Sequence, residues 1–144
     1  LMQLYPSKRT PKYMLEFIDF CCKDLGLDKL RGSIEINFKR GALDGQSYGL
    51  TWGDSREVII EIAGSQHGEK ISRQDKLQTV AHELTHAHQY LTHKMKNMEY
   101  VVSVEWEGKQ VTSDKYHDQN VPWEVEAEEA EMRLYNKWES GGYK

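Results

Sequence analysis

The sequence has few cysteines and no long hydrophobic run. Its only cysteines, Cys21 and Cys22, are adjacent, and neighbouring cysteines rarely bridge each other, so we expect core packing and no disulfide framework. The longest apolar runs are about four or five residues, whereas a transmembrane helix needs about 20. No apolar stretch follows the basic residues near the start, so we expect no signal peptide. These absences predict a cytoplasmic protein without a membrane partner.

An excess of positive charge is also missing. The net charge is −4, and the 19 lysines and arginines are scattered, apart from Lys8, Arg9 and Lys12. Phosphate binding needs clustered cations, so we expect no nucleic-acid partner. The 144 residues contain neither a repeat nor a linker. The chain is therefore expected to form a single domain over residues 1–144.

The hydrophobic periodicity predicts an α+β fold. Helical spacing predicts helices at 11–25, 73–96 and 122–138. Alternation and turn residues predict strands at 33–39, 47–52 and 57–63 and a hairpin over 101–112. We expect a small mixed sheet of about three strands packed on the 73–96 helix, with the second hairpin and the C-terminal helix beside it.

Residues 80–90, VAHELTHAHQY, place His82 and His86 four positions apart with Glu83 between them. At about 100° per residue the two imidazoles share one face of a helix, opposite an apolar stripe. Two neutral imidazoles one turn apart can bind one tetrahedral Zn²⁺. Glu83, about 60–100° round the helix, is placed to deprotonate a water molecule. The spacing predicts a zinc site with Glu83 as general base; a surface histidine pair is the alternative.

A catalytic zinc site has three protein ligands and an open position. The metzincin extension is excluded because Gln89 and Thr92 stand where it needs glycine and histidine. Residues 122–131, PWEVEAEEAE, offer several glutamates, and the packing face of their helix favours Glu124 as the inward-leaning third ligand. The alternatives that stay open are Glu126, His117 and Asp118.

Other residues near these ligands have expected supporting roles. Glu128, one turn after Glu124, is expected to accept a hydrogen bond from a ligand imidazole and to fix its tautomer. Tyr116 and His117 are candidate donors to the oxyanion of a tetrahedral intermediate. His88 lies on the apolar stripe, so we expect a hydrogen-bonded core histidine there.

HELTH at 82–86, followed by Glu124-Val125-Glu126-Ala127, resembles the gluzincin metallopeptidases, whose third zinc ligand is the glutamate of an ExxA(D/N) helix. The WEGK and PWEVEA segments are also similar to short phage-borne and bacterial metallopeptidase domains. The resemblance covers about residues 72–140 and implies a compact zincin core and a phage-encoded protein. It implies Zn²⁺ on His82, His86 and Glu124. It also implies that an edge strand, 57–63 or 48–52, aligns an extended peptide.

The function expected from the sequence is zinc-dependent hydrolysis of peptide bonds, with a peptide or protein as substrate. One alternative is a zincin-fold module that binds metal and peptide without turnover, and the presence of Glu83 counts against it. The other is a SprT-like peptidase that acts on DNA-bound proteins with His117 as third ligand. The acidic balance of the chain counts against that alternative.

Overall fold

A four-stranded mixed sheet forms the centre of the chain. A computed structural model describes residues 2–97, 103–112 and 121–141. The sheet has the order β1-β2-β4-β3, in which β1, β2 and β4 are parallel and β3 runs antiparallel to β4. Its strands are β1 (Gln3–Pro6), β2 (Ser33–Phe38), β3 (Gly49–Gly53) and β4 (Glu57–Ile62).

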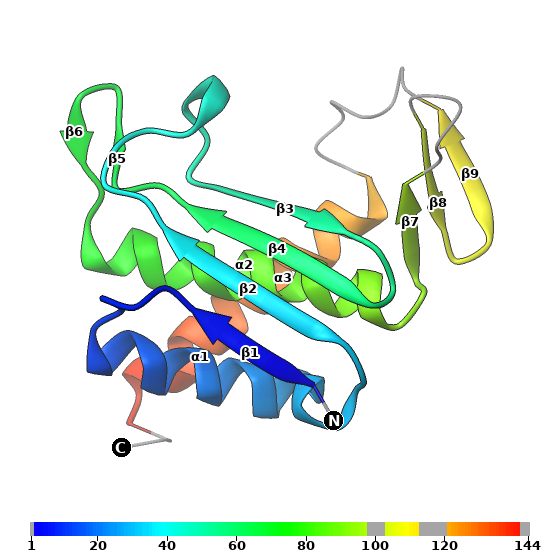
Figure 1. The fold of residues 1–144 in the computed structure, drawn as a ribbon, viewed down its shortest axis with the longest axis horizontal. Coiled ribbons are helices and arrows are strands. Elements are labelled where there is room, and N and C mark those ends of the chain that lie inside the picture. Colours follow the sequence, from blue (N-terminus) through cyan, green and yellow to red (C-terminus); the bar gives the residue numbers. More distant parts are fainter. Residues whose placement is uncertain (1, 98–102, 113–120, 142–144) are drawn as a thin grey trace.

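Three helices lie on one face of this sheet (Figure 1). They are α1 (Lys12–Leu25), α2 (Arg73–Leu91) and α3 (Pro122–Glu139). Helix α2 packs against β3, β4, α1 and α3. The strands alternate so that one set of side chains is buried against the helices, namely Ile34, Ile36, Val58, Ile60 and Ile62. This alternation is what a sheet covered on one face requires.

A two-stranded hairpin, a three-stranded sheet and two short 3-10 helices complete the described parts. The hairpin of β5 (Ser65–Gln66) and β6 (Glu69–Lys70) lies before α2. A second sheet, β7-β8-β9, follows α2 and lies at the opposite end of the molecule (Figure 1). Its strands are β7 (Met95–Asn97), β8 (Ser103–Trp106) and β9 (Lys109–Thr112), and the 3-10 helices are η1 (Leu27–Lys29) and η2 (Asp44–Gln46).

The α+β fold class is confirmed, with small mixed sheets and a C-terminal helix. The central sheet has four strands rather than three because Gln3–Pro6 pairs with β2, a strand that was not predicted. Helix α2 ends at Leu91 rather than near Lys96. The chain leaves the helix at His93, whose φ of 64° is a left-handed conformation usually taken by glycine.

The core lies between the sheet and the helices. Cys21 and Cys22 are buried and free, as expected for core packing without a disulfide. Near the end of α3, Trp138 meets Phe17 of α1 edge to face, with ring centroids 5.3 Å apart. No helix in the described residues is both long and apolar enough to cross a membrane.

Candidate metal centre

Helix α2 presents the two histidines of the HELTH segment on the face turned towards α3. The Oγ of Ser72 caps the helix by accepting a hydrogen bond from the backbone N–H of Asp75 at 3.1 Å. Leu77, Val80 and Leu84 are buried against the core. The side chain of His82 keeps 16% of its surface exposed, whereas that of His86 is buried, with 9% exposed.

Helix α3 runs antiparallel to α2 and brings Glu124 to this pair. Near one end of the contact, the Nε2 of Gln89 donates to the carbonyl of Trp123 at 3.0 Å. Near the other end, Gln78 lies against Met132. Residues late in α2 therefore face residues early in α3. This arrangement places the Glu124 carboxylate opposite the middle of α2.

The two imidazoles and the Glu124 carboxylate converge on one point. The Nε2 of His86 lies 2.8 Å from Glu124 Oε1, and the Nε2 of His82 lies 3.3 Å from Glu124 Oε2. The two Nε2 atoms are 3.2 Å apart. In a tetrahedral zinc site with bonds of about 2.0–2.1 Å, ligand atoms are separated by about 3.3 Å. The three side chains thus have the spacing of a metal-binding group.

The opposite ring nitrogens are held by acceptors, which fixes the tautomers. The Nδ1 of His82 donates to Glu131 Oε1 at 2.8 Å, and the Nδ1 of His86 donates to Gln89 Oε1 at 2.7 Å. The Gln89 amide can face only this way, because its Nε2 donates to the Trp123 carbonyl. When neutral, both imidazoles therefore direct the lone pair of Nε2 towards Glu124, as metal ligands do.

The supporting carboxylate is Glu131 and not Glu128, so that expectation was wrong. Glu128 is exposed on α3. Glu131 lies seven residues after Glu124, two helical turns along the same face. Because α3 runs antiparallel to α2, the residue two turns after Glu124 lies beside the outer side of His82 and not between the two histidines.

The cluster favours a positive charge between the imidazoles and Glu124. Burial lowers the pKa of His82, but hydrogen bonds with Glu124 and Glu131 outweigh it and raise that pKa to about 10. Burial raises the pKa of Glu124, but hydrogen bonds with both histidines outweigh it and hold that pKa well below its usual range. The charge can be a proton or a metal cation, because both are attracted to the same lone pairs.

Of the alternative third ligands, Glu126 is the one that lies within the described residues. Glu126 points to the other flank of α3, where it forms an ion pair with Lys94 and accepts a hydrogen bond from Gln89 at 3.1 Å. The structure therefore does not bring Glu126 to the histidine pair. His117 and Asp118, the other candidate ligands, and Tyr116, the candidate oxyanion donor, lie outside the described residues.

Glu83 lies beside the cluster and contacts the edge of the central sheet. Its Oε1 accepts a hydrogen bond from the hydroxyl of Thr51 in β3 at 2.7 Å, and its side chain is buried. Gly49 allows this approach, because a Cβ there would lie 2.8 Å from the Cγ of Glu83. Glycine is thus required at this position for the carboxylate to sit against the strand.

A pocket of about 580 Å³ opens in front of these groups. It is lined by Thr79, His82, Glu83, Glu124 and Glu131 from the helices, and by Ser47, Tyr48, Gly49 and Gln66 from β3 and the segments beside it. Strand β3 is the edge of the sheet next to this pocket, whereas β4 lies inside the sheet. Of the two expected edge strands, 48–52 is therefore correct and 57–63 is wrong.

His88 does not belong to the cluster. It is half-buried on another face of α2, in a separate pocket with Lys94 and Arg133. Burial lowers its pKa. Its side chain makes no hydrogen bond with the residues that the structure describes, so the expected hydrogen-bonded core histidine is not found there.

Comparison with protein-family models, with curated proteins and with solved structures gives no match. The function therefore has to be inferred from the residues of the site.

Proposed function

We propose that this chain is a zinc-dependent peptidase whose ligands are His82, His86 and Glu124. The observation that carries the proposal is the convergence of three electron-pair donors, two Nε2 atoms and a carboxylate, within 3.3 Å of their neighbours. Such donors repel each other unless a cation lies among them. Two imidazoles and one carboxylate with an open side form the donor set of catalytic zinc sites.

The residues around the ligands have the roles that peptide hydrolysis requires. A zinc ion in such a donor set supplies Lewis acidity, which polarises a peptide carbonyl and acidifies water. Glu83 takes the proton of the attacking water and delivers it to the nitrogen of the leaving amine. The hydroxyl of Thr51 holds one oxygen of the Glu83 carboxylate, which leaves the other oxygen for this proton transfer.

Strand β3 offers a way to align the substrate. In the described residues it pairs only with β4, so its outer backbone groups are free to pair with an extended peptide. Such a peptide would pass in front of Glu83, because Thr51 of this strand contacts that side chain. The free, buried cysteines suit a reducing compartment, and we include a cytoplasmic location in the proposal.

The substitution Glu83→Gln tests the catalytic role, because glutamine keeps the size of the side chain but cannot accept the proton. We expect bound zinc to remain at the wild-type level. Hydrolysis of a quenched fluorescent peptide library should fall by a factor of about 10²–10⁴, the usual contribution of a general base. Glu128→Gln, which changes an exposed glutamate of α3, is the matched control and should retain full activity.

A zinc-loaded wild-type protein that cleaves no peptide of the library would contradict the peptidase proposal. It would leave the alternative of a module that binds metal and peptide without turnover. A Glu83→Gln protein with wild-type activity would remove Glu83 from the mechanism.

A further inference from the structure

The structure gathers cations that are scattered along the sequence. Strands β1, β2 and β4 are parallel, so their carboxyl ends lie at one edge of the sheet, together with the β5–β6 hairpin and the first turns of α1 and α2 (Figure 1). Eight of the 19 lysines and arginines follow these strand ends, belong to this hairpin or lie in the first turns of these helices, namely Lys8, Arg9, Lys12, Lys39, Arg40, Lys70, Arg73 and Lys76.

Four of these cations line one pocket. It has a volume of about 490 Å³ and is lined by Lys39, Arg40, Lys70 and Lys76 together with Gly64, Ser65 and Gly68, without any acidic residue. Lys39 is paired with Glu61 at 3.2 Å. Arg40, Lys70 and Lys76 have no carboxylate partner among the described residues. The lysines of α1 and α3, by contrast, are each paired with a carboxylate, namely Lys12, Lys23 and Lys137. This pocket therefore holds a local surplus of positive charge.

The floor of the pocket is backbone held by hydrogen bonds. The N–H of Gly64 donates to the carbonyl of Gly41 at 3.0 Å, and the N–H of Ile71 donates to the carbonyl of Gly64 at 3.1 Å. The two segments approach so closely that a Cβ on Gly64 would lie 2.4 Å from the carbonyl oxygen of Lys39. The cationic side chains therefore surround a fixed floor.

The β5–β6 hairpin separates this pocket from the pocket of about 580 Å³ in front of Glu83, called the catalytic pocket. Ser65 pairs with Lys70 and Gln66 pairs with Glu69, and directly opposite residues of an antiparallel pair point to the same face. Ser65 and Lys70 line the pocket of the four cations, while Gln66 lines the pocket in front of Glu83. The hairpin is held in place by η2, where the Nε2 of Gln66 donates to the carbonyl of Gln46 at 2.7 Å.

We propose that the pocket of Lys39, Arg40, Lys70 and Lys76, called the basic pocket, binds carboxylates of an acidic segment of the polypeptide substrate. The inference rests on the proposed peptidase function, because it makes the basic pocket a specificity site for the same chain that enters the catalytic pocket. The β5–β6 hairpin between the two pockets is about 10 Å thick. Acidic residues roughly four positions or more from the scissile bond would therefore reach the basic pocket.

An acidic peptide fits this surface better than a nucleic acid. The eight cations named above lie at one edge of a chain whose net charge is −4. The open face of the adjacent sheet presents Glu35, Glu57 and Glu61. A long phosphate backbone would cross this acidic face, whereas a few carboxylates fit within the basic pocket.

Binding of fluorescein-labelled hexaglutamate, measured by fluorescence anisotropy on the Glu83→Gln protein, tests the inference without turnover. We expect hexaglutamate to bind, to bind more weakly as salt rises, and hexaglutamine not to bind. The double substitution Lys70→Glu/Lys76→Glu should weaken hexaglutamate binding at least about tenfold. Glutamate is tolerated in the first turn of α2, so this variant is expected to fold.

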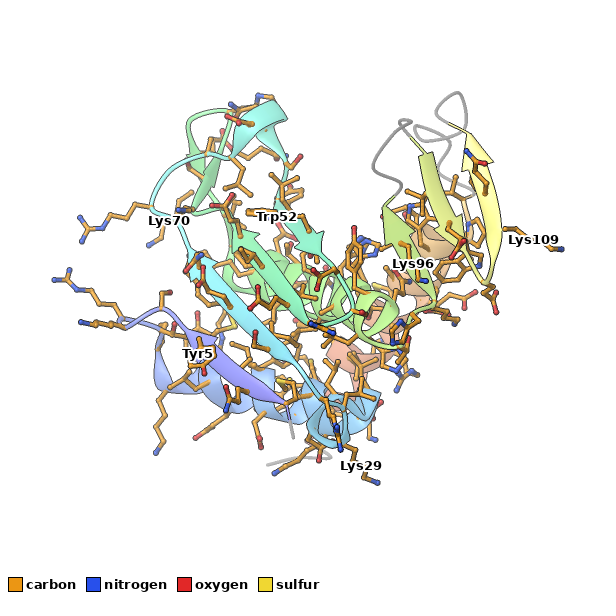
Figure 2. The ribbon with its side chains drawn as sticks, turned by 45° about the vertical axis from the view of Figure 1, so that its right-hand side comes forward. Tyr5, Lys29, Trp52, Lys70, Lys96 and Lys109 are labelled. Carbon is orange, nitrogen blue, oxygen red and sulfur yellow. The ribbon has the colours of Figure 1, made fainter. Side chains whose placement is uncertain are left out.

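The matched control is Lys29→Glu/Lys109→Glu, which has the same net charge. Figure 2 shows Lys29 and Lys109 far from Lys70, on other sides of the molecule. We expect this control to bind hexaglutamate within about twofold of the parent protein, because only charges within the Debye length act strongly. Equal loss in both double variants, or no binding of hexaglutamate, would overturn the inference. A labelled 12-nucleotide single strand of DNA that binds more tightly than hexaglutamate through Lys70 and Lys76 would also overturn it, in favour of a nucleic acid.

The role in catalysis is tested on any peptide that the wild-type protein cleaves. Extension of that peptide with four glutamates should lower KM relative to extension with four glutamines, and Lys70→Glu/Lys76→Glu should abolish the difference while kcat stays the same. Equal KM values in the wild type would contradict the inference and leave the peptidase proposal intact. If the protein binds hexaglutamate but holds no zinc, the proposed peptidase function is wrong and the binding of carboxylates by the basic pocket is supported.

Discussion

Gln89 is fully buried, and each atom of its amide has a defined partner. Its Oε1 accepts from His86, and its Nε2 donates to the carbonyl of Trp123 and to Glu126. Because this amide cannot turn round without losing these bonds, it determines which nitrogen of His86 carries the lone pair towards Glu124. Gln89 is therefore a positioning residue for His86, the proposed metal ligand.

The substitution Gln89→Leu should weaken zinc binding by about 10–100-fold, the usual effect of removing the acceptor behind a ligand histidine. Competition with a chromophoric zinc chelator measures the affinity, and circular dichroism checks that the variant is folded. Gln74→Leu changes an exposed glutamine of the same helix and should bind zinc like the wild type. A folded Gln89→Leu protein with wild-type zinc affinity would show that the His86 tautomer does not depend on Gln89.

The sequence predicts the centre of the site better than its surroundings. The spacing of His82 and His86 is a property of one helix, and the packing face of a second helix was sufficient to choose Glu124. The partners of Nδ1 depend on how the two helices cross, which no single-helix pattern contains. The spacing of Glu131, two turns after Glu124, indicates the acceptor for Nδ1 of His82 only once α3 is known to run antiparallel to α2. Gln89, one turn after His86, is recognisable in the sequence only as a departure from the metzincin pattern.

At the scale of elements, the approach of β3 to α2 depends on Gly49. A Cβ at this position would lie 2.7 Å from Thr79 Cγ2 and 2.8 Å from Glu83 Cγ. Such contacts force the strand and the helix apart or displace the Glu83 side chain. Both responses disturb the pair of Thr51 and Glu83 on which the proposed base depends.

Gly49→Ala is expected to lower the free energy of unfolding by about 1–3 kcal/mol, the usual cost of overpacking. Urea denaturation measures it. Gly41→Ala is the control, because a Cβ at Gly41 meets nothing within 4 Å. Bound zinc should be unchanged in both variants, since neither position touches a ligand. Equal stability of the two variants would mean that β3 does not press on α2 at this point.

The carboxylate of Asp24 in α1 binds two cationic side chains of α3. Asp24 accepts from Arg133 at 2.5 Å and from Lys137 at 2.9 Å, and its side chain is 12% exposed. Burial raises the pKa of Asp24, but hydrogen bonds with these two cations outweigh it and lower the pKa below its ordinary value. The contact thus stabilises the folded state wherever Asp24 is ionised.

Asp24→Asn should reduce the free energy of unfolding at pH 7 by about 1 kcal/mol, a modest value because both cations are half-exposed. A carboxyl whose pKa is lower in the folded state stabilises above its unfolded pKa of about 3.9 and loses this effect as the pH falls. The difference between wild type and variant should therefore be constant from pH 7 to 5 and shrink below about pH 4. Asp28→Asn, an exposed neighbour, is the control, and a difference that persists at low pH would contradict this assignment.

The elements that the sequence did not predict were those without a local signal. Residues 3–6 form a four-residue strand that ends in proline, and only its pairing with β2 makes it part of the sheet. Helix α2 was expected to reach Lys96, because no glycine or proline marks the stop at His93. Where glycine did mark an end, as at Gly26 after α1, the predicted boundary was correct.

At the scale of the whole molecule, α2 packs on the central sheet and lies antiparallel to α3, and the site lies where the two helices meet next to the edge strand β3. The same arrangement places the catalytic pocket and the basic pocket on the two faces of one hairpin. The α+β fold class followed from hydrophobic periodicity alone. The grouping of cations at one edge did not, because it depends on parallel strands bringing distant segments together.

The central claim is that His82, His86 and Glu124 hold one zinc ion. Elemental analysis of the purified wild type after incubation with zinc and gel filtration tests it most directly, together with Glu124→Ala, Glu126→Ala and the exposed control Glu129→Ala. We predict one zinc per chain in the wild type, in Glu126→Ala and in Glu129→Ala, and a loss of zinc in Glu124→Ala. A folded wild-type protein without zinc, or a Glu124→Ala protein that keeps it, would contradict the proposed site.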